Sequence, residues 1–240
     1  MEIGYESKYH KLEKDYWWFA ARRDIIFRLI GKEKRNPKIL DIGCSGGALL
    51  NELKHRGFIN LYGIDISKQA IITAKKQGLK DVKVCNASSL NLPDNYFDIL
   101  IASDIIEHIE HPKIALKEWH RVLKKGGRLI IFAPAFKGLW SSHDIINRHY
   151  RRFTQQELLL LLTQSGFHTL KSGYWNTFLF LPLYLMNKLK SKTKKKDNLY
   201  DTSPVVSRLL LALILSENKA INAGINMPFG VSVFAIASKH

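Results

Sequence analysis

The chain has 240 residues and a formal net charge of +16 at pH 7. Its apolar fraction of 46% and aromatic fraction of 11% predict a sizeable hydrophobic core and exclude a mainly disordered chain. Its two cysteines exclude a disulfide framework and favour a reducing compartment, so we expect a cytoplasmic protein.

The positive charge is concentrated in one part of the chain. Residues 128–196 hold 12 Lys and Arg against 2 Asp and Glu, a net charge of +10, whereas residues 1–127 hold 22 and 16, a net of +6. A local excess of this kind indicates a local anionic partner rather than a generally basic protein. A nucleic acid and an anionic membrane surface are the two partners that fit.

The first expected helix covers residues 5–30. The residues before it carry neither a basic nor an apolar run, so we expect no signal peptide. The helix contains an aromatic cluster, residues 16–19, followed by the basic pair Arg22 and Arg23. Its aromatic side chains can pack on the edge of a sheet. Alternatively, residues 1–36 form a helical lid over a ligand site.

Residues 39–47 have the pattern of a buried strand that runs into a glycine-rich turn and then a helix. Gly43 permits a sharp turn, and Gly47 lets the backbone come close to a ligand. The following helix offers free backbone N–H groups to that ligand. A dinucleotide fingerprint needs glycines at positions 43, 45 and 48, but Ser45 and Ala48 occupy two of them.

A second strand is expected to begin at residue 60 and to end in an acidic residue, Asp65. Ser67 is placed to cap the helix that follows. An acid at the end of the second strand can accept hydrogen bonds from a ribose diol. The other expected elements are strands over 82–85, 97–102, 129–133, 167–174 and 231–237 and helices over 112–123 and 154–165.

Residues 41–47, D-I-G-C-S-G-G, resemble motif I of the class I S-adenosylmethionine-dependent methyltransferases, D-x-G-C-G-x-G. Ser45 stands where the middle glycine is usual. Further landmarks of that family match at residues 86–87, at the Phe-Asp and Glu-His pairs within 97–108, and at the L-K-x-G-G turn of 123–127.

The resemblance covers residues 37–174 and implies a Rossmann-like α/β fold. We expect a seven-stranded sheet with helices on both faces. Its final strand lies within residues 229–240 and inserts antiparallel between the fifth and sixth strands. Residues 175–228 then form a C-terminal helical insertion.

The resemblance also implies S-adenosylmethionine as the cofactor. Asp65 is expected to hold the ribose, Asn86 to accept from the adenine amino group in place of the usual Asp, and Arg22 to meet the methionine carboxylate. The residues expected to bind the cofactor are Asp41, Gly43, Ser45, Gly47, Asp65, Ile66, Asn86, Ala87, Ser103 and Arg22.

Candidate catalytic residues follow the fourth and fifth strands. A neutral imidazole at His108 can act as a base near pH 7, or it can hydrogen-bond nearby backbone in a structural role. The polar loop after the fifth strand lies at the edge where α/β enzymes bind ligands, although it also fits a solvated basic loop. We expect a base among His108, His143 and His149, and substrate contacts at Asp144, Arg151 and Arg152. No second cluster completes a metal site, so we expect no metal.

The insertion begins with an apolar and aromatic run over residues 175–186 and continues with six lysines between 188 and 196. A second apolar run covers residues 209–215, and both are shorter than the ~18 residues of a membrane span. An apolar segment with a basic tail is typical of an interfacial anchor. This pattern therefore predicts that residues 175–200 make a peripheral contact with an anionic inner membrane surface. A helical cap on the sheet and a homodimer interface are the alternatives.

The sequence thus predicts methyl transfer from S-adenosylmethionine to a hydroxyl or carboxyl oxygen of a small-molecule, glycan or lipid-linked acceptor. The positive charge also motivates a nucleic-acid methyltransferase. However, residues 103–106 lack the Asn/Asp-Pro-Pro-aromatic motif of enzymes that methylate exocyclic amines. A cofactor-binding scaffold without catalysis is the other alternative.

Overall fold

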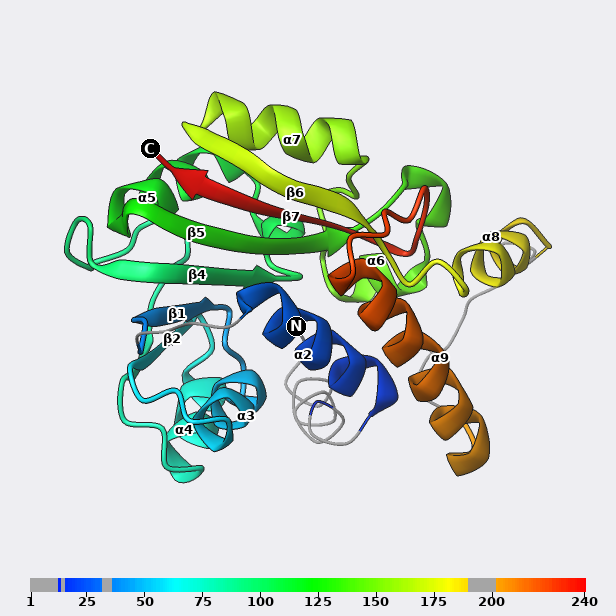
Figure 1. The fold of residues 1–240 in the computed structure, drawn as a ribbon, viewed down its shortest axis with the longest axis horizontal. Helices are drawn as coiled ribbons and strands as arrows, with labels where there is room; N and C mark the ends of the chain where they lie inside the picture. The colour runs from blue at the N-terminus through cyan, green and yellow to red at the C-terminus, as the bar shows by residue number, and fades with distance from the viewer. Residues whose placement is uncertain (1–12, 14–15, 32–35, 190–201) are drawn as a thin grey trace.

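The structure is a computed structural model that describes residue 13 and residues 16–31, 36–189 and 202–240. Within this part of the chain, one seven-stranded sheet has the order β3-β2-β1-β4-β5-β7-β6. Strand β7 runs antiparallel to both of its neighbours, and the remaining pairs are parallel. The predicted seven-stranded α/β fold, with its last strand between the fifth and sixth, is confirmed (Figure 1).

The described elements agree with the expected ones at most positions. The strands are β1 Ile39–Ile42, β2 Leu61–Asp65, β3 Val82–Val84, β4 Phe97–Ser103, β5 Leu123–Pro134, β6 Phe167–Trp175 and β7 Ser232–Lys239. The helices are α2 Trp17–Ile30, α3 Ala48–His55, α4 Lys68–Lys76, α5 Pro112–Val122, α6 Ser142–Ile146, α7 Gln155–Gln164, α8 Phe180–Leu189 and α9 Pro204–Asn222, with short 3-10 turns η1 Ile106–His108 and η2 Lys137–Leu139. The expected first helix is confirmed from Trp17, while residues 5–12 lie outside the described part.

The fifth strand is longer than predicted. It begins at Leu123, which pairs with Phe97, rather than at Leu129. The register shifts before Arg128 pairs with Ile99, and the left-handed Gly126 (φ +74°) lies inside this irregular stretch. The double glycine therefore bends the strand instead of preceding it.

Both faces of the sheet are covered, which explains why its strands read as continuous apolar runs. One core cluster joins Ile39 and Ile99 of the sheet to buried residues of α2, α3, α4 and α9. The other joins Leu40 and Leu100 to residues of α5 and α7. Figure 1 shows α2, α3 and α4 below the sheet and α7 above it.

The second apolar run of the insertion lies in α9, which runs beside α2 (Figure 1). Asn218 joins three elements because its Nδ2 donates to the Ala21 carbonyl at 2.9 Å and its Oδ1 accepts from Trp175 Nε1 at 2.7 Å. The neighbouring Glu217 accepts from the backbone N–H of Asn176 at 2.6 Å and of Thr177 at 3.0 Å. These buried polar contacts fix α9 against the core.

Replacing Asn218 with alanine is expected to lower the free energy of unfolding by about 3 kcal/mol, because it leaves buried donors and acceptors unpaired. Urea denaturation followed by circular dichroism measures the loss. Asn222→Ala is the matched control, since Asn222 is exposed at the end of the same helix. Equal stabilities of the two variants would contradict this account of the α9 packing.

The first apolar run lies mostly in α8 and leaves several large apolar side chains in solvent. Phe178 is 50% exposed, Leu181 57%, Leu185 47% and Met186 46%. The lysines from 190 to 196, which belong to the predicted membrane segment 175–200, lie outside the described residues. Among the helices that the structure describes, none combines the length and the apolar character needed to cross a membrane.

Candidate functional site

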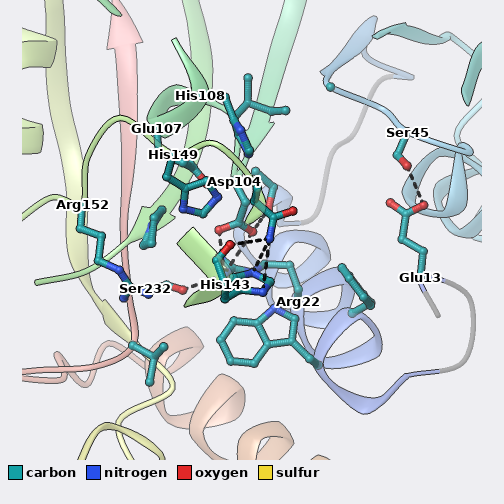
Figure 2. A pocket seen from close by; sticks show the side chains of 18 of the residues that line it. Glu13, Arg22, Ser45, Asp104, Glu107, His108, His143, His149, Arg152 and Ser232 are labelled. Carbon is teal, nitrogen blue, oxygen red and sulfur yellow. Dashed lines mark hydrogen bonds and ion pairs between the residues drawn. The ribbon is translucent and has the colours of Figure 1, made fainter. Parts of the chain in front are cut away.

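A large cavity opens at the carboxyl ends of β1, β2 and β4, with a volume of about 1840 Å³. This edge is where open α/β sheets bind ligands. Side chains of α2 form one wall, and residues of α6 and α8 form another. Figure 2 shows Ser45 and Glu13 on one side of the cavity and Glu107, His108 and His149 on the opposite side.

The glycine-rich turn after β1 has the backbone that a close ligand approach requires. Gly43 has φ +79°, and a Cβ at this position would collide with the side chain of Ile105. Ser45 also adopts a left-handed conformation, with φ +48°, which explains why a glycine is usual at its place in the motif. Its hydroxyl donates to Glu13 Oε2 at 2.9 Å. The turn therefore keeps its shape despite the substituted glycine.

Asp65 connects two loops at the cavity. Its Oδ2 accepts from the Ser45 N–H at 2.9 Å, and its Oδ1 accepts from the Ser67 N–H at 2.8 Å. Ser67 caps α4 as predicted, because its hydroxyl accepts from the Ala70 N–H at 3.1 Å. Asp65 therefore ties the glycine-rich turn to the start of α4, and its expected contact with a ribose stays a prediction.

The cavity is acidic although the protein as a whole is basic. Six acidic side chains line it against three arginines, counted among the described residues. Burial, together with the nearby carboxylates of Glu13 and Asp65, raises the pKa of Asp41 to about 8. A cationic ligand would stabilise the ionised carboxylates, so the field in the cavity favours positively charged ligands.

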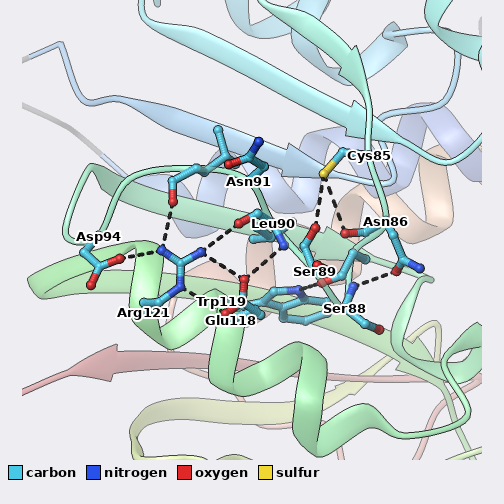
Figure 3. A network of polar contacts seen from close by, with 12 residues as sticks. Cys85, Asn86, Ser88, Ser89, Leu90, Asn91, Asp94, Glu118, Trp119 and Arg121 are labelled. Atoms are coloured by element: carbon cyan, nitrogen blue, oxygen red, sulfur yellow. Dashed lines mark hydrogen bonds and ion pairs between the residues drawn. The ribbon is translucent and has the colours of Figure 1, made fainter.

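A polar network holds the loop after β3 (Figure 3). Asn86 Oδ1 accepts from the Ser88 N–H at 2.8 Å, which forms a local turn. The Ala87 carbonyl accepts from Trp119 Nε1 at 2.9 Å. Arg121 donates to the Leu90 carbonyl at 2.7 Å. The exposed Asn86 amide is thus fixed at the rim of the cavity, and its contact with adenine stays a prediction.

Arg22 lies on the floor of the cavity. Its guanidinium is 4.2 Å from the ring centres of both Phe132 and Trp175, which places it between two aromatic faces. It donates to Ser232 Oγ at 2.8 Å and forms an ion pair with Asp104 at 3.3 Å. Asp104 has a left-handed backbone, with φ +56°. Arg22 therefore positions Asp104, and its expected contact with a carboxylate of the cofactor stays a prediction.

Asp144 forms a fully buried ion pair. Arg152 Nε is 2.8 Å from Oδ1 and its NH2 is 2.9 Å from Oδ2, while His149 Nδ1 lies 2.9 Å from Oδ1. Burial alone would raise the pKa of Asp144, but the contacts with His149 and Arg152 hold it well below its usual range. Ser141 completes the group through a capping box with Asp144. Asp144 organises the loop from inside instead of facing a substrate.

Glu107 and His108 lie side by side on η1, facing the cavity. Glu107 is 1% exposed, and burial, with Asp104 nearby, raises its pKa well above the usual range. Burial and the neighbouring His149 lower the pKa of His108 to about 4. The His108 and His149 rings are 4.5 Å apart. His108 is therefore neutral at pH 7, but its low pKa makes it a weak base.

Sequence reasoning missed Glu107. The signal was the Glu-His pair after the fourth strand, of which only the histidine was taken as a candidate. The predicted residues that line the cavity are Arg22, Asp41, Gly43, Ser45, Asp65, Ile66, Asn86, Ala87, Ser103, His108, His143, His149 and Arg152. Gly47, Asp144 and Arg151 lie outside the lining, and Arg151 instead donates to the Glu110 carbonyl at 2.7 Å.

Comparison with known proteins gives matches over the sheet and its motifs. A family model described as a methyltransferase domain matches residues 40–131. A ubiquinone biosynthesis O-methyltransferase of Pelagibacter ubique is 38% identical over 114 residues, which cover 45% of this chain and 47% of that protein. The chloroplastic 2-methyl-6-phytyl-1,4-hydroquinone methyltransferase of Spinacia oleracea is 29% identical over 129 residues, which cover 52% and 38%. The chain thus matches less than half the length of these two relatives.

A solved structure shares the fold. The S-adenosylmethionine-dependent methyltransferase from Archaeoglobus fulgidus superimposes with a TM-score of 0.63 at 23% identity. The superposition covers 96% of this chain and 99% of the other. At this identity the likeness concerns the arrangement of the sheet and helices alone.

Proposed function

This chain belongs to the class I S-adenosylmethionine-dependent methyltransferases, and we propose that it methylates an oxygen atom of a small, partly apolar acceptor. S-adenosylmethionine is its cofactor. The observation that carries the proposal is the acidic cavity, which extends from the turn at Ser45 to the cluster at Glu107 and His149. A nucleic-acid acceptor is disfavoured because its phosphates would meet this acidic lining.

The cofactor, when bound, supplies an electrophilic methyl group on a cationic sulfur that departs as a neutral thioether. The turn around Gly43 and Ser45 offers backbone close to the ligand, and Asp65 would accept from its ribose hydroxyls. The acidic residues Asp41 and Asp104 complement its positive charge. Together these residues orient the methyl group toward the opposite side of the cavity.

The acceptor would occupy the side of the cavity that faces α6 and α8. The volume of about 1840 Å³ exceeds what one small ligand fills, so two molecules fit side by side. Apolar side chains line this side, among them Leu139, Trp140, Leu183 and Met186. They support an acceptor with an apolar part, in keeping with the phytyl-hydroquinone in the name of the spinach relative.

Methylation of a hydroxyl requires the loss of its proton. Glu107, His108 and His149 would meet the acceptor oxygen, since they line the cavity opposite the glycine-rich turn. Asp144 fixes His149 by the 2.9 Å contact at Nδ1, which leaves Nε2 for the acceptor side. His143 lies on α6 beside Asn147, with 3.2 Å between His143 Nε2 and Asn147 Nδ2. We place proton removal at His149, because burial keeps Glu107 protonated and the low pKa of His108 makes it a weak base.

We also propose that the acceptor is linked to lipid and reached at an anionic membrane surface. The exposed Leu181, Leu185 and Met186 of α8 support this, together with the six lysines between 188 and 196 in the sequence. Each lysine near such a surface contributes ~1 kcal/mol. Flotation with anionic vesicles should recover the intact chain, and a variant with these lysines replaced by glutamine should stay unbound. Equal recovery of both would contradict this part of the proposal.

Transfer of a labelled methyl group tests the central proposal. The protein is incubated with methyl-labelled S-adenosylmethionine and hydroquinones that carry or lack an isoprenoid tail. Label is expected in the acceptor, with faster transfer to the tailed compounds because of the apolar lining. If the cofactor binds and no hydroxyl, carboxyl or lipid acceptor becomes labelled, the chain is a cofactor-binding scaffold instead.

A further inference from the structure

We propose that Glu107, His108 and His149 together bind a divalent transition-metal cation at the acceptor side of the cavity. One nitrogen or oxygen atom from each residue lies within 4.8 Å of the others, and Figure 2 shows the three side chains gathered there. Tetrahedral ligands with bonds of ~2.1 Å stand about 3.4 Å apart. Small side-chain rotations would therefore close the set around an ion. This inference reverses the expectation of no metal from the sequence.

The first argument is the unsatisfied carboxylate of Glu107. Its side chain is 1% exposed, and neither carboxylate oxygen has a hydrogen-bond partner among the described residues. Buried polar groups in proteins are usually hydrogen-bonded or coordinate metals, because leaving one without a partner is unfavourable. A cation bound at both histidines would supply the missing partner.

The second argument is the charge balance around the cluster. Arg22 pairs with Asp104, and Arg152 pairs with Asp144, so these four charges offset one another. Neither arginine forms an ion pair with Glu107 among the described contacts. A divalent cation at the cluster would favour the ionised form of Glu107 without disturbing either ion pair.

The third argument is the orientation of the imidazole rings. Metal-binding histidines usually donate their second ring N–H to a carboxylate or a backbone carbonyl. His149 has this arrangement, because its Nδ1 contacts the ionised Asp144 at 2.9 Å and leaves Nε2 available. The His108 ring lies beside it, with 4.5 Å between the two ring centres. His149 is thus supported as a metal ligand needs to be, and His108 is placed next to it.

The ligand set indicates the class of cation. Two imidazole nitrogens with one carboxylate suit zinc and neighbouring first-row metals, whereas magnesium and calcium prefer oxygen ligands alone. Three protein ligands leave a coordination position open, as in catalytic zinc sites. The three residues line the same cavity as the proposed cofactor site.

The role of the ion rests on the proposed methyl transfer to oxygen. An acceptor hydroxyl bound to the cation would lose its proton to solvent at neutral pH. The resulting oxygen anion would then form the O–CH3 bond as the methyl–sulfur bond of the cofactor breaks, and the neutral thioether leaves. No histidine base is needed in this scheme.

Zinc titration calorimetry of the metal-stripped, untagged full chain tests the site. The wild type is expected to bind one zinc ion, and Glu107→Gln and His149→Gln to bind it about 100-fold more weakly. His111→Gln, at an exposed histidine three residues from His108, is the matched control and should bind as the wild type does. Cobalt in place of zinc should give the visible absorption of a four-coordinate site in the wild type and in His111→Gln, but not in the two ligand variants.

Two results would overturn the inference. One is no zinc binding by the wild type, and the other is wild-type zinc affinity in Glu107→Gln and His149→Gln. Thermal unfolding shows whether each variant folds, and a parallel titration with S-adenosylmethionine separates the two proposals. If zinc binds while the cofactor does not, the proposed function fails and the metal site stands. If the cofactor binds while zinc does not, the metal site fails alone.

Discussion

Replacing Asp65 with alanine is expected to weaken S-adenosylmethionine binding by about 100-fold, because hydrogen bonds to a charged acceptor contribute ~1.5–3 kcal/mol each. Two ribose hydroxyls would lose their acceptor. The N–H groups of Ser45 and Ser67 would also lose the carboxylate that holds both loops at 2.9 and 2.8 Å. Isothermal calorimetry of the purified variant measures the affinity directly.

Two further variants make this experiment specific. Asp65→Asn keeps one acceptor oxygen and should fall between the wild type and the alanine variant. Asp81→Ala removes an exposed carboxylate that does not line the cavity, so it should bind as the wild type does. Wild-type affinity in Asp65→Ala would show that the cofactor does not use the end of β2.

Replacing Asp144 with asparagine is expected to lower the free energy of unfolding by about 3–5 kcal/mol, the usual loss when one partner of a buried ion pair is removed. The guanidinium of Arg152, which is 8% exposed, would lose its counterion. His149 would lose the carboxylate that orients its ring. Urea unfolding followed by circular dichroism measures the difference.

The double variant Asp144→Leu with Arg152→Met separates the charge effect from general damage to the loop. It removes both charges together and should recover most of the stability that the single change loses. Methyl transfer should not recover, because His149 still lacks its orienting partner. A single variant as stable as the wild type would contradict the buried pair.

Much of the sheet was predictable because its signals are local. The apolar runs at 39–42 and 97–102 end in glycine or polar turns, and the positions of the strands follow from them. The packing of α9 on α2 was not predictable. It depends on Asn218, one polar residue in a leucine-rich helix, and sequence spacing does not tell which polar residue of such a helix is buried.

The sequence carries clearer signals for the cofactor side of the cavity than for the acceptor side. The motif at 41–47 and the acid at Asp65 carry distinctive spacings, so cofactor contacts could be predicted residue by residue, and those contacts stay predictions. Asp144 was expected at the substrate because a loop carboxylate gives no sign that an arginine eight residues later will enclose it. Glu107 lies in a single 3-10 turn, which is too short to show the periodicity that marks a buried position.

Titration of the intact chain with S-adenosylmethionine, with NAD in parallel, tests the central claim most directly. The account predicts one site with micromolar affinity for S-adenosylmethionine and no binding of NAD, because the acidic cavity suits a cation and the glycine spacing does not suit a dinucleotide. Binding of NAD without S-adenosylmethionine, or binding of neither, would contradict it.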